Sequence, residues 1–500
     1  MAILGGFKKM IKGWLEIHDS PTTVITIEEK LNFDTNCIKN KLWMRGDPSE
    51  LEQFYKQIYN QDAMFWGMVP YIKIRKIHLG IPEIMVSTLT SIVLNDLNGI
   101  ELNERGNEWE EISKDNKFND LLESAIGKAL YLGDGAFKIS YDKTTSEYPI
   151  IEFFGADDID IINKRGRFKE CVFKTKYTYK EKNYVLYETY GFGYIKNKLF
   201  RMPEQKEVPL ESIPFTKDLK DYKFAGYNED KNGTPISKGK FCMAIPFMIF
   251  KSPKWEGRGK SIFDGKEGPF DAVDETISQW MDAVRSGRTN KYIPKSLLPR
   301  NPETGYVLNP NDFDNRFIVT ESDMGENSKN EIKITQPVIP SESYLQAYVT
   351  ALDAALQGII SPSTIGIDVK KLDNAEAQRE KEKATLYTRN KIIDAISECI
   401  PILINNVLKT YSLYTEKKVC DDLSVTVSFG EYANPSFEAT VETVAKAKQG
   451  GIMSIETSVD ELYGDSKDEK WKKEEVKRLK VEQGIEELEE PLIPNVGDMA

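Results

Sequence analysis

Apolar residues recur at steps of three and four from Ser341 to Ile359, and this spacing predicts an amphipathic helix. The stripe consists of Leu345, Val349, Leu352, Leu356 and Ile359. Pro340 and Ser341 are expected to end the preceding segment and to cap the helix. A longer helix is predicted from Asp373 to Tyr411; it opens with polar residues and becomes amphipathic near Leu386. A polar opening is typical of a helix that faces solvent or lines a wet cavity.

A third helix with one apolar face is predicted from Pro269 to Arg288. It matches the 341–359 helix in length, so the two are expected to pack side by side and antiparallel. The predicted packing residues of this pair are Phe270, Ile277, Trp280, Leu345, Leu352 and Leu356. About fifty residues rich in Pro and Asn lie between the two helices, and because a structureless loop of that length is improbable they predict a small α/β lobe.

In the rest of the chain, the spacing of apolar residues is that of helices in some segments and that of strands in others. Buried helices are predicted at Ile81–Asn95 and Phe118–Tyr131. From Phe137 to about residue 250, aromatic and β-branched residues alternate with Lys and Glu, which predicts a β-rich domain. The pattern as a whole indicates an α+β fold, mostly helical, with this β-rich domain inserted.

Composition and charge argue against several classes of protein. Five hundred residues with 40% hydrophobic content can bury more than one core, so several domains are expected. No apolar run approaches the roughly twenty residues of a membrane span, and the N-terminus lacks the pattern of a signal peptide, which predicts a cytoplasmic chain without a membrane partner. The net charge of −12 argues against tight, sequence-independent wrapping of nucleic acid. It does not exclude a surface that nucleic acid slides past.

The cysteines and one glycine-rich run could carry chemistry. The five cysteines are widely spaced without a C-x-x-C pair, so neither a disulfide framework nor a zinc site is predicted. The run Gly257-Arg258-Gly259-Lys260-Ser261 ends like a phosphate-binding loop, but Lys254 stands where that motif needs its first glycine, and a glycine-rich turn before the next helix is favoured. No cofactor is expected.

An acidic cluster is the alternative site. Asp157, Asp158 and Asp160 are predicted on a strand, where carboxylates at alternate positions bind Mg²⁺ in a nuclease. A solvated strand edge is the favoured interpretation. The two histidines, His18 and His78, have no Ser or Cys nearby in the sequence that would complete a catalytic set.

The order of segments resembles the portal proteins of tailed double-stranded DNA phages and related prophages, of the branch common in Gram-positive hosts. The resemblance covers roughly residues 35 to 485. No catalytic signature is among the motifs that carry it, and their order and spacing are what make it specific. These motifs are Trp43–Tyr55, Ala129–Asp142, Gly257–Asp274, Ser286–Pro294, Asn374–Glu380 and Tyr463–Glu469.

The resemblance implies a structural protein of the virion rather than an enzyme. It implies a ring of about twelve subunits at a capsid vertex, assembled in the host cytoplasm, through which double-stranded DNA is packaged and ejected. Its implied partners are the major capsid protein, scaffold, terminase large subunit and head–tail adaptor. The implied parts are a helical N-terminal wing part (1–135), a β-rich wing domain (136–268), stem helices (269–289 and 341–359), a clip (290–340), a tunnel loop (360–372), a long wing helix with a strand (373–432), and a crown with a disordered tail (433–500).

The tunnel loop is the predicted DNA-facing site. Its candidate residues are Ser363, Thr364, Asp368, Lys370 and Lys371. The two lysines are equally well explained as solvated residues before the next helix. Acidic positions of the stem, Asp271 and Asp274 among them, are further candidates to line the channel. Two other functional classes stay open: a different head or tail scaffold protein, and a metal-dependent nucleic-acid enzyme built on the acidic cluster.

Overall fold

The computed structural model describes residues 31–58, 64–68, 74–229, 235–287, 290–298, 300–306, 317–321, 331–366, 375–415, 418–430, 437–463 and 469–482. These residues form an α+β fold, as the sequence predicted. Two compact units result: one joins residues 1–95 and 99–427, and the other joins residues 96–98 and 428–500.

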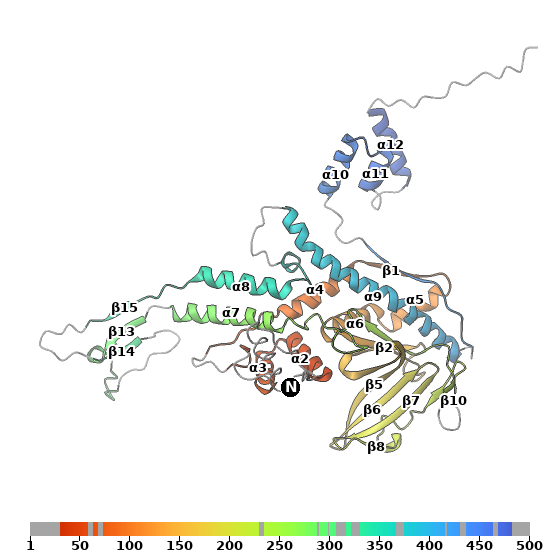
Figure 1. Ribbon diagram of the computed structural model, residues 1–500, viewed down its shortest axis with the longest axis horizontal. Helices are drawn as coiled ribbons and strands as arrows, with labels where there is room; N and C mark the ends of the chain where they lie inside the picture. The colour runs from red at the N-terminus through yellow and green to blue at the C-terminus, as the bar shows by residue number, and fades with distance from the viewer. Residues whose placement is uncertain are drawn as a thin grey trace, which may run out of the picture. The chain divides into compact units, whose positions relative to one another are not determined.

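The helices of the first unit include those that the apolar spacing predicted, whereas α5 was not predicted (Figure 1). They are α2 (Phe33–Arg45), α3 (Pro48–Ile58), α4 (Ile81–Asn95), α5 (Gly106–Asp115), α6 (Phe118–Leu132), α7 (Glu267–Ser286), α8 (Ser341–Leu356) and α9 (Ala375–Thr415). Short 3-10 turns are η1 (Ala156–Asp158), η2 (Leu210–Ser212), η3 (Lys295–Leu297) and η4 (Pro362–Ile365).

The hairpin helices differ from the prediction at their ends. Helix α7 begins at Glu267, before Pro269, and α8 ends at Leu356 because Gln357 is extended and Gly358 adopts a positive φ of 76°. The predicted Ser341 cap is wrong, since Ser341 is the first helical residue and Pro340 precedes it without a side-chain cap. The predicted start of α9 at Asp373 lies outside the described residues.

Strands occupy most of the predicted β-rich region. They are β2 (Asp134–Ser140), β3 (Ile150–Gly155), β4 (Ile159–Lys164), β5 (Arg167–Tyr179), β6 (Lys182–Gly191), β7 (Tyr194–Met202), β8 (Lys206–Val208), β9 (Tyr222–Lys223), β10 (Asn228–Glu229), β11 (Pro235–Ser237) and β12 (Ala244–Met248). An antiparallel sheet runs β4-β5-β6-β7-β8 with β9 on β7, a second runs β12-β2-β3, and β10 pairs with β11.

Between α7 and α8 lies a three-stranded sheet. Strand β13 (Asn290–Pro294) pairs in parallel with β14 (Phe317–Thr320) and antiparallel with β15 (Lys333–Thr335). The predicted α/β lobe is therefore mainly β, and the helical element among its described residues is the turn η3. One strand before α5 was not predicted: β1 (Leu97–Leu102) pairs with β16 (Val425–Phe429).

The core of the first unit is formed where α6 and α9 pack on the β12-β2-β3 sheet and α4 packs on both helices. Helix α9 contributes a continuous apolar face of Ile392, Ile396, Ile400, Leu403, Ile404, Val407 and Leu408, all at most 1% exposed. Within this face Asn406 is tied to the segment before β12, because its Nδ2 donates to the carbonyl of Cys242 at 2.9 Å. The sheet and its helices thus form a rigid base from which α7 and α8 emerge.

The second unit contains α10 (Phe437–Gln449), α11 (Ile455–Tyr463) and α12 (Glu469–Glu482). Tyr463 and Trp471 pack edge to face with ring centroids 5.0 Å apart, and Lys472 binds Asp460 at 2.8 Å. Contacts of this kind join α11 to α12.

All five cysteines are free thiols, and four of them are buried. Burial raises the pKa of Cys242 to about 12, so this thiol stays protonated and unreactive. In the part of the chain that the structure describes, no helix combines the length and the apolar character needed to cross a membrane.

Candidate functional site: the α7–α8 hairpin and its base

Helices α7 and α8 lie side by side and antiparallel, as predicted (Figure 1). Near the last turns of α7 and the first turn of α8, the Trp280 and Tyr344 rings stack, with centroids 6.2 Å apart and planes 7° apart. At the base, the Lys266 Nζ donates to the carbonyls of Ala354 and Gln357, each at 2.9 Å. A cation at the negative C-terminal end of α8 satisfies carbonyls that the helix itself leaves unpaired. Burial, together with repulsion from Lys260, lowers the pKa of Lys266.

The six predicted packing residues occupy five different environments. Leu352 and Leu356 are buried at the base, Trp280 lies in the stack, and Ile277 is half-buried. Phe270 is buried too, but against Trp43 and Phe263, with centroids 5.5 and 5.6 Å away, because the first turns of α7 are covered by α2. Leu345 follows Tyr344 and therefore points about 100° away from the stack; it is 46% exposed.

The segment after α8 is fastened to α9 by hydroxyl groups. Thr385 Oγ1 accepts from the backbone N–H of Ser361 at 2.8 Å and lies 3.1 Å from Thr364 Oγ1. Thr388 Oγ1 donates to the carbonyl of Ile359 at 2.6 Å. The turn η4 is therefore held against α9 before the chain leaves it.

These contacts place part of the predicted tunnel loop. Ser363 is exposed and its hydroxyl lies 2.7 Å from that of Ser361, whereas Thr364 is engaged with α9. Asp368, Lys370 and Lys371 lie outside the described residues. Beside η4 a cavity of about 450 Å³ is lined by Thr350, Asp353, Gln357, Ser361, Pro362 and Ala384.

Two acidic residues of α7 do not face outward as the sequence suggested. Asp271 is 7% exposed and accepts from the backbone N–H groups of Phe65 at 2.7 Å and Trp66 at 3.1 Å. Asp274, 2% exposed, lies 2.7 Å from the Nδ1 of His78 and accepts from the Trp66 indole at 3.1 Å. The two buried carboxylates thus anchor residues 64–68 and 74–79 to the start of α7, so neither is available to line a channel.

Burial is the main influence on Asp271. It raises the pKa of this carboxyl to about 6, while the two backbone hydrogen bonds oppose the shift. No local sequence signal shows this cluster, since its partners are about two hundred residues apart along the chain.

The glycine-rich run Gly257–Ser261 before α7 is held in place by hydrogen bonds to Asp134. The Arg258 guanidinium binds Asp134 through Nε and Nη2, each at 2.9 Å, and the N–H of Gly259 donates to the same carboxylate at 2.6 Å. Burial alone would lower the pKa of Arg258, but the hydrogen bonds to Asp134 raise it. A Cβ on Gly259 would lie 2.0 Å from the carbonyl oxygen of Gly133, so only glycine fits there.

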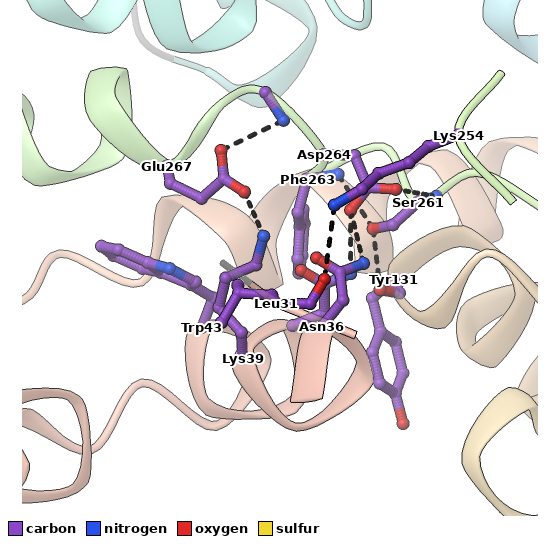
Figure 2. Close-up of polar contacts among 12 residues, drawn as sticks. Leu31, Asn36, Lys39, Trp43, Tyr131, Lys254, Ser261, Phe263, Asp264 and Glu267 are labelled. Atoms are coloured by element: carbon purple, nitrogen blue, oxygen red, sulfur yellow. Dashed lines mark hydrogen bonds and ion pairs between the residues drawn. The ribbon is translucent and has the colours of Figure 1, made fainter. Parts of the chain in front are cut away.

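The end of this run is also bound from within the chain. Ser261 Oγ donates to the carbonyl of Tyr131 at 2.7 Å (Figure 2). Asp264 accepts from Asn36 at 3.0 Å, and Lys39 of α2 forms an ion pair with Glu267 of α7. The Gly259 N–H and the Ser261 hydroxyl, which a phosphate-binding loop would offer to its ligand, are thus bound within the chain, in agreement with the predicted glycine-rich turn.

The acidic cluster is neutralised by neighbouring lysines. Asp160 binds Lys174 at 2.7 Å and Asp158 lies 3.4 Å from Lys176, both on the adjacent strand β5. Asp157 pairs with Lys41 of α2. Asp157 and Asp158 lie in the turn η1 rather than on a strand, so the predicted alternation is wrong here. Lysines paired with the carboxylates disfavour a shared divalent cation.

No protein-family model and no protein of curated function matches this chain. Solved structures with some similarity come from gene transfer agent particles. A chain in the neck of a native gene transfer agent particle, computed with C12 symmetry, is 11% identical with a TM-score of 0.34; the match covers 76% of this chain and 88% of that one. A chain in the virion of a native gene transfer agent particle is 12% identical with a TM-score of 0.33, covering 84% and 89%. Similarity at this level does not establish a shared fold.

Proposed function

We propose that this chain is the portal subunit of a tailed phage or prophage head. The supporting observation is the α7–α8 hairpin, which leaves the base with a small sheet between its helices and returns through the turn η4 onto the long helix α9. This order of parts is the one on which the sequence resemblance rests.

In this proposal α7 and α8 are the stem, and the β13–β15 segment within residues 290–340 is the clip that contacts a head–tail adaptor. Residues 360–372 form the tunnel loop, and residues 433–500 form the crown and tail. About twelve copies form a ring at a capsid vertex. The other partners are the major capsid protein, scaffold and terminase large subunit.

The mechanism is passive conduction of double-stranded DNA. A terminase hydrolyses ATP and drives the DNA, while the ring guides and retains it and later releases it to the tail. A net charge of −12 prevents the DNA from adhering to the walls. Lys370 and Lys371, repeated around the ring, supply a local cationic belt for transient phosphate contact. The residues fastened to α9 by Thr385 hold the start of this loop at a fixed position.

The first test is mass and symmetry. Native mass spectrometry and averaged electron micrographs of the purified protein should show a ring of about twelve copies with a central hole. A closed dimer would contradict the proposal. An asymmetric or open assembly would favour the alternative of another head or tail scaffold protein.

The second test addresses the loop. Lys370→Ala combined with Lys371→Ala should leave ring assembly intact and reduce the amount of DNA packaged or retained, because the cationic belt is lost. Lys217→Ala with Lys220→Ala is the matched control, since both lysines are exposed and far in sequence from the hairpin. Packaging equal to wild type in the loop variant would remove these lysines from the mechanism.

A further inference from the structure

The far half of the hairpin exposes large apolar side chains. Met281 and Val284 of α7 are 50% and 45% exposed, and Leu345 of α8 is 46% exposed. The near half is different, because Phe270, Val273, Leu352 and Leu356 are at most 2% exposed. Exposed apolar side chains grouped on one element mark a surface that something else covers.

These apolar residues share one face of the hairpin. The stacked pair Trp280–Tyr344 marks the line along which the helices touch. Met281 and Leu345 each follow a member of this pair, so each is rotated by about 100° from that line. Because the helices are antiparallel, these equal rotations turn both side chains to the same side. Val284 and the half-buried Tyr348 lie on that side too. We name Met281, Val284, Leu345 and Tyr348 the apolar face.

Near the same height, the opposite side of the hairpin carries four residues, of which all but Gln279 have short side chains. Gln279 and Ser343 each precede a member of the stacked pair, so they are rotated by about 100° in the opposite sense and lie on this side. Ala283 and Ala347, one turn later on each helix, lie there too. All four are exposed or half-buried. We name Gln279, Ala283, Ser343 and Ala347 the small face. Large side chains at the level of small ones are complementary shapes for helix packing.

Two charged residues of α7 have positions that suit packing of the apolar face of one copy on the small face of another. Asp282 borders the small face and Arg285 borders the apolar face, on the same outer edge of the helix and less than one turn apart. In the described part of the chain neither has an ion-pair partner. When the apolar face of one copy lies on the small face of the next, Arg285 of the first copy meets the oppositely charged Asp282 of the second.

We infer that the hairpins of neighbouring copies pack head to tail, the apolar face of one on the small face of the next. This inference rests on the proposed function, and it names the partner of the hairpin as a second copy of this chain. A head-to-tail contact uses two different surfaces of each copy, so it closes into a ring when the rotation fits.

Thiol cross-linking tests the contact directly. Leu345→Cys and Ala347→Cys are made separately in a Cys420→Ser background, since Cys420 is the one native thiol that is not buried. With a short bismaleimide, a mixture of the two proteins should give a dimer band that neither protein gives alone. The variant carrying both cysteines should give a ladder of multimers. Dimers from Leu345→Cys alone would instead show a two-fold contact between apolar faces and overturn the inference.

A charge exchange provides the independent measurement. Arg285→Asp alone and Asp282→Arg alone should each reduce the fraction of protein in rings at least about tenfold, and the double variant should restore it. Failure of the double variant to assemble where wild type does would contradict the pairing.

Micrographs recorded on the same samples separate the two proposals. Rings without the mixed cross-link would overturn the hairpin contact and leave the portal proposal standing. Protein that forms no ring and no cross-link would overturn both.

Discussion

The buried pair between Arg258 and Asp134 should dominate the stability of the base of the hairpin. Asp134 is fully buried and the Arg258 side chain is 12% exposed, so solvent screens their attraction little. In Asp134→Asn the amide keeps one acceptor oxygen for three donors, and its own N–H groups face the guanidinium. Removing one partner of a buried ion pair costs about 3–5 kcal/mol.

Thermal unfolding followed by circular dichroism measures this loss. For a unit as large as the first one, 1 kcal/mol shifts the melting temperature by about 1 °C, so the melting temperature should fall by about 3–5 °C. Glu110→Gln is the control, because its pair with Lys114 is well exposed and its loss should leave the melting temperature unchanged. If Asp134→Asn melted within about 1 °C of wild type, the carboxylate would not be the group that holds the glycine-rich run in place.

Two further predictions concern the hairpin. The pKa of Asp271 in the folded state, about 6, lies above its ordinary value of 3.8, so the folded state binds this proton more tightly than the unfolded state does. The protonated carboxyl therefore stabilises the fold fully below about pH 4, and this stabilisation disappears as the pH rises through about 6. The free energy of unfolding of wild type should therefore fall by about 2–3 kcal/mol relative to Asp271→Asn across that range, measured by urea titration at several pH values, and parallel curves would contradict the burial. Lys266→Met removes both hydrogen bonds to the end of α8 and should lower the free energy of unfolding by about 1–2 kcal/mol. Lys260→Met, at an exposed position, is the control and should leave the free energy of unfolding unchanged. Equal effects of the two variants in the urea titration would show that Lys266 does not stabilise the end of α8.

The sequence predicted correctly those helices whose own residues mark where the helix begins or which face is buried. Gly80 and Pro82 mark the start of α4, and its limits agree with the prediction to the residue. The apolar spacing of three and four located the hairpin helices, because the faces that bury Leu352 and Phe270 also set that spacing. Ends were less accurate where caps were absent, as at Ser341.

Contacts across the chain were not predictable in this way. His78 and Asp274 are 196 residues apart, and each looks ordinary in its own segment. Asp271 and Asp274 match the preference of acidic residues for a helix start, which hid their role as buried acceptors. The acidic cluster was recognisable from sequence, but its lysine partners come from β5 and α2, whose positions only the fold reveals.

Helix α7 behaves mechanically as a beam clamped at one end. Its first three turns are fixed by Asp271, Asp274 and Ser278 to residues 64–68 and 74–79, and by Glu267 to Lys39. Its remaining length, out of about 30 Å in all, is supported sideways by α8 among the helices and strands that the structure describes. A load applied at the far end is therefore resisted at the clamp, where the bending moment is largest. Tension or torsion on the three-stranded sheet would be felt first at those buried carboxylates.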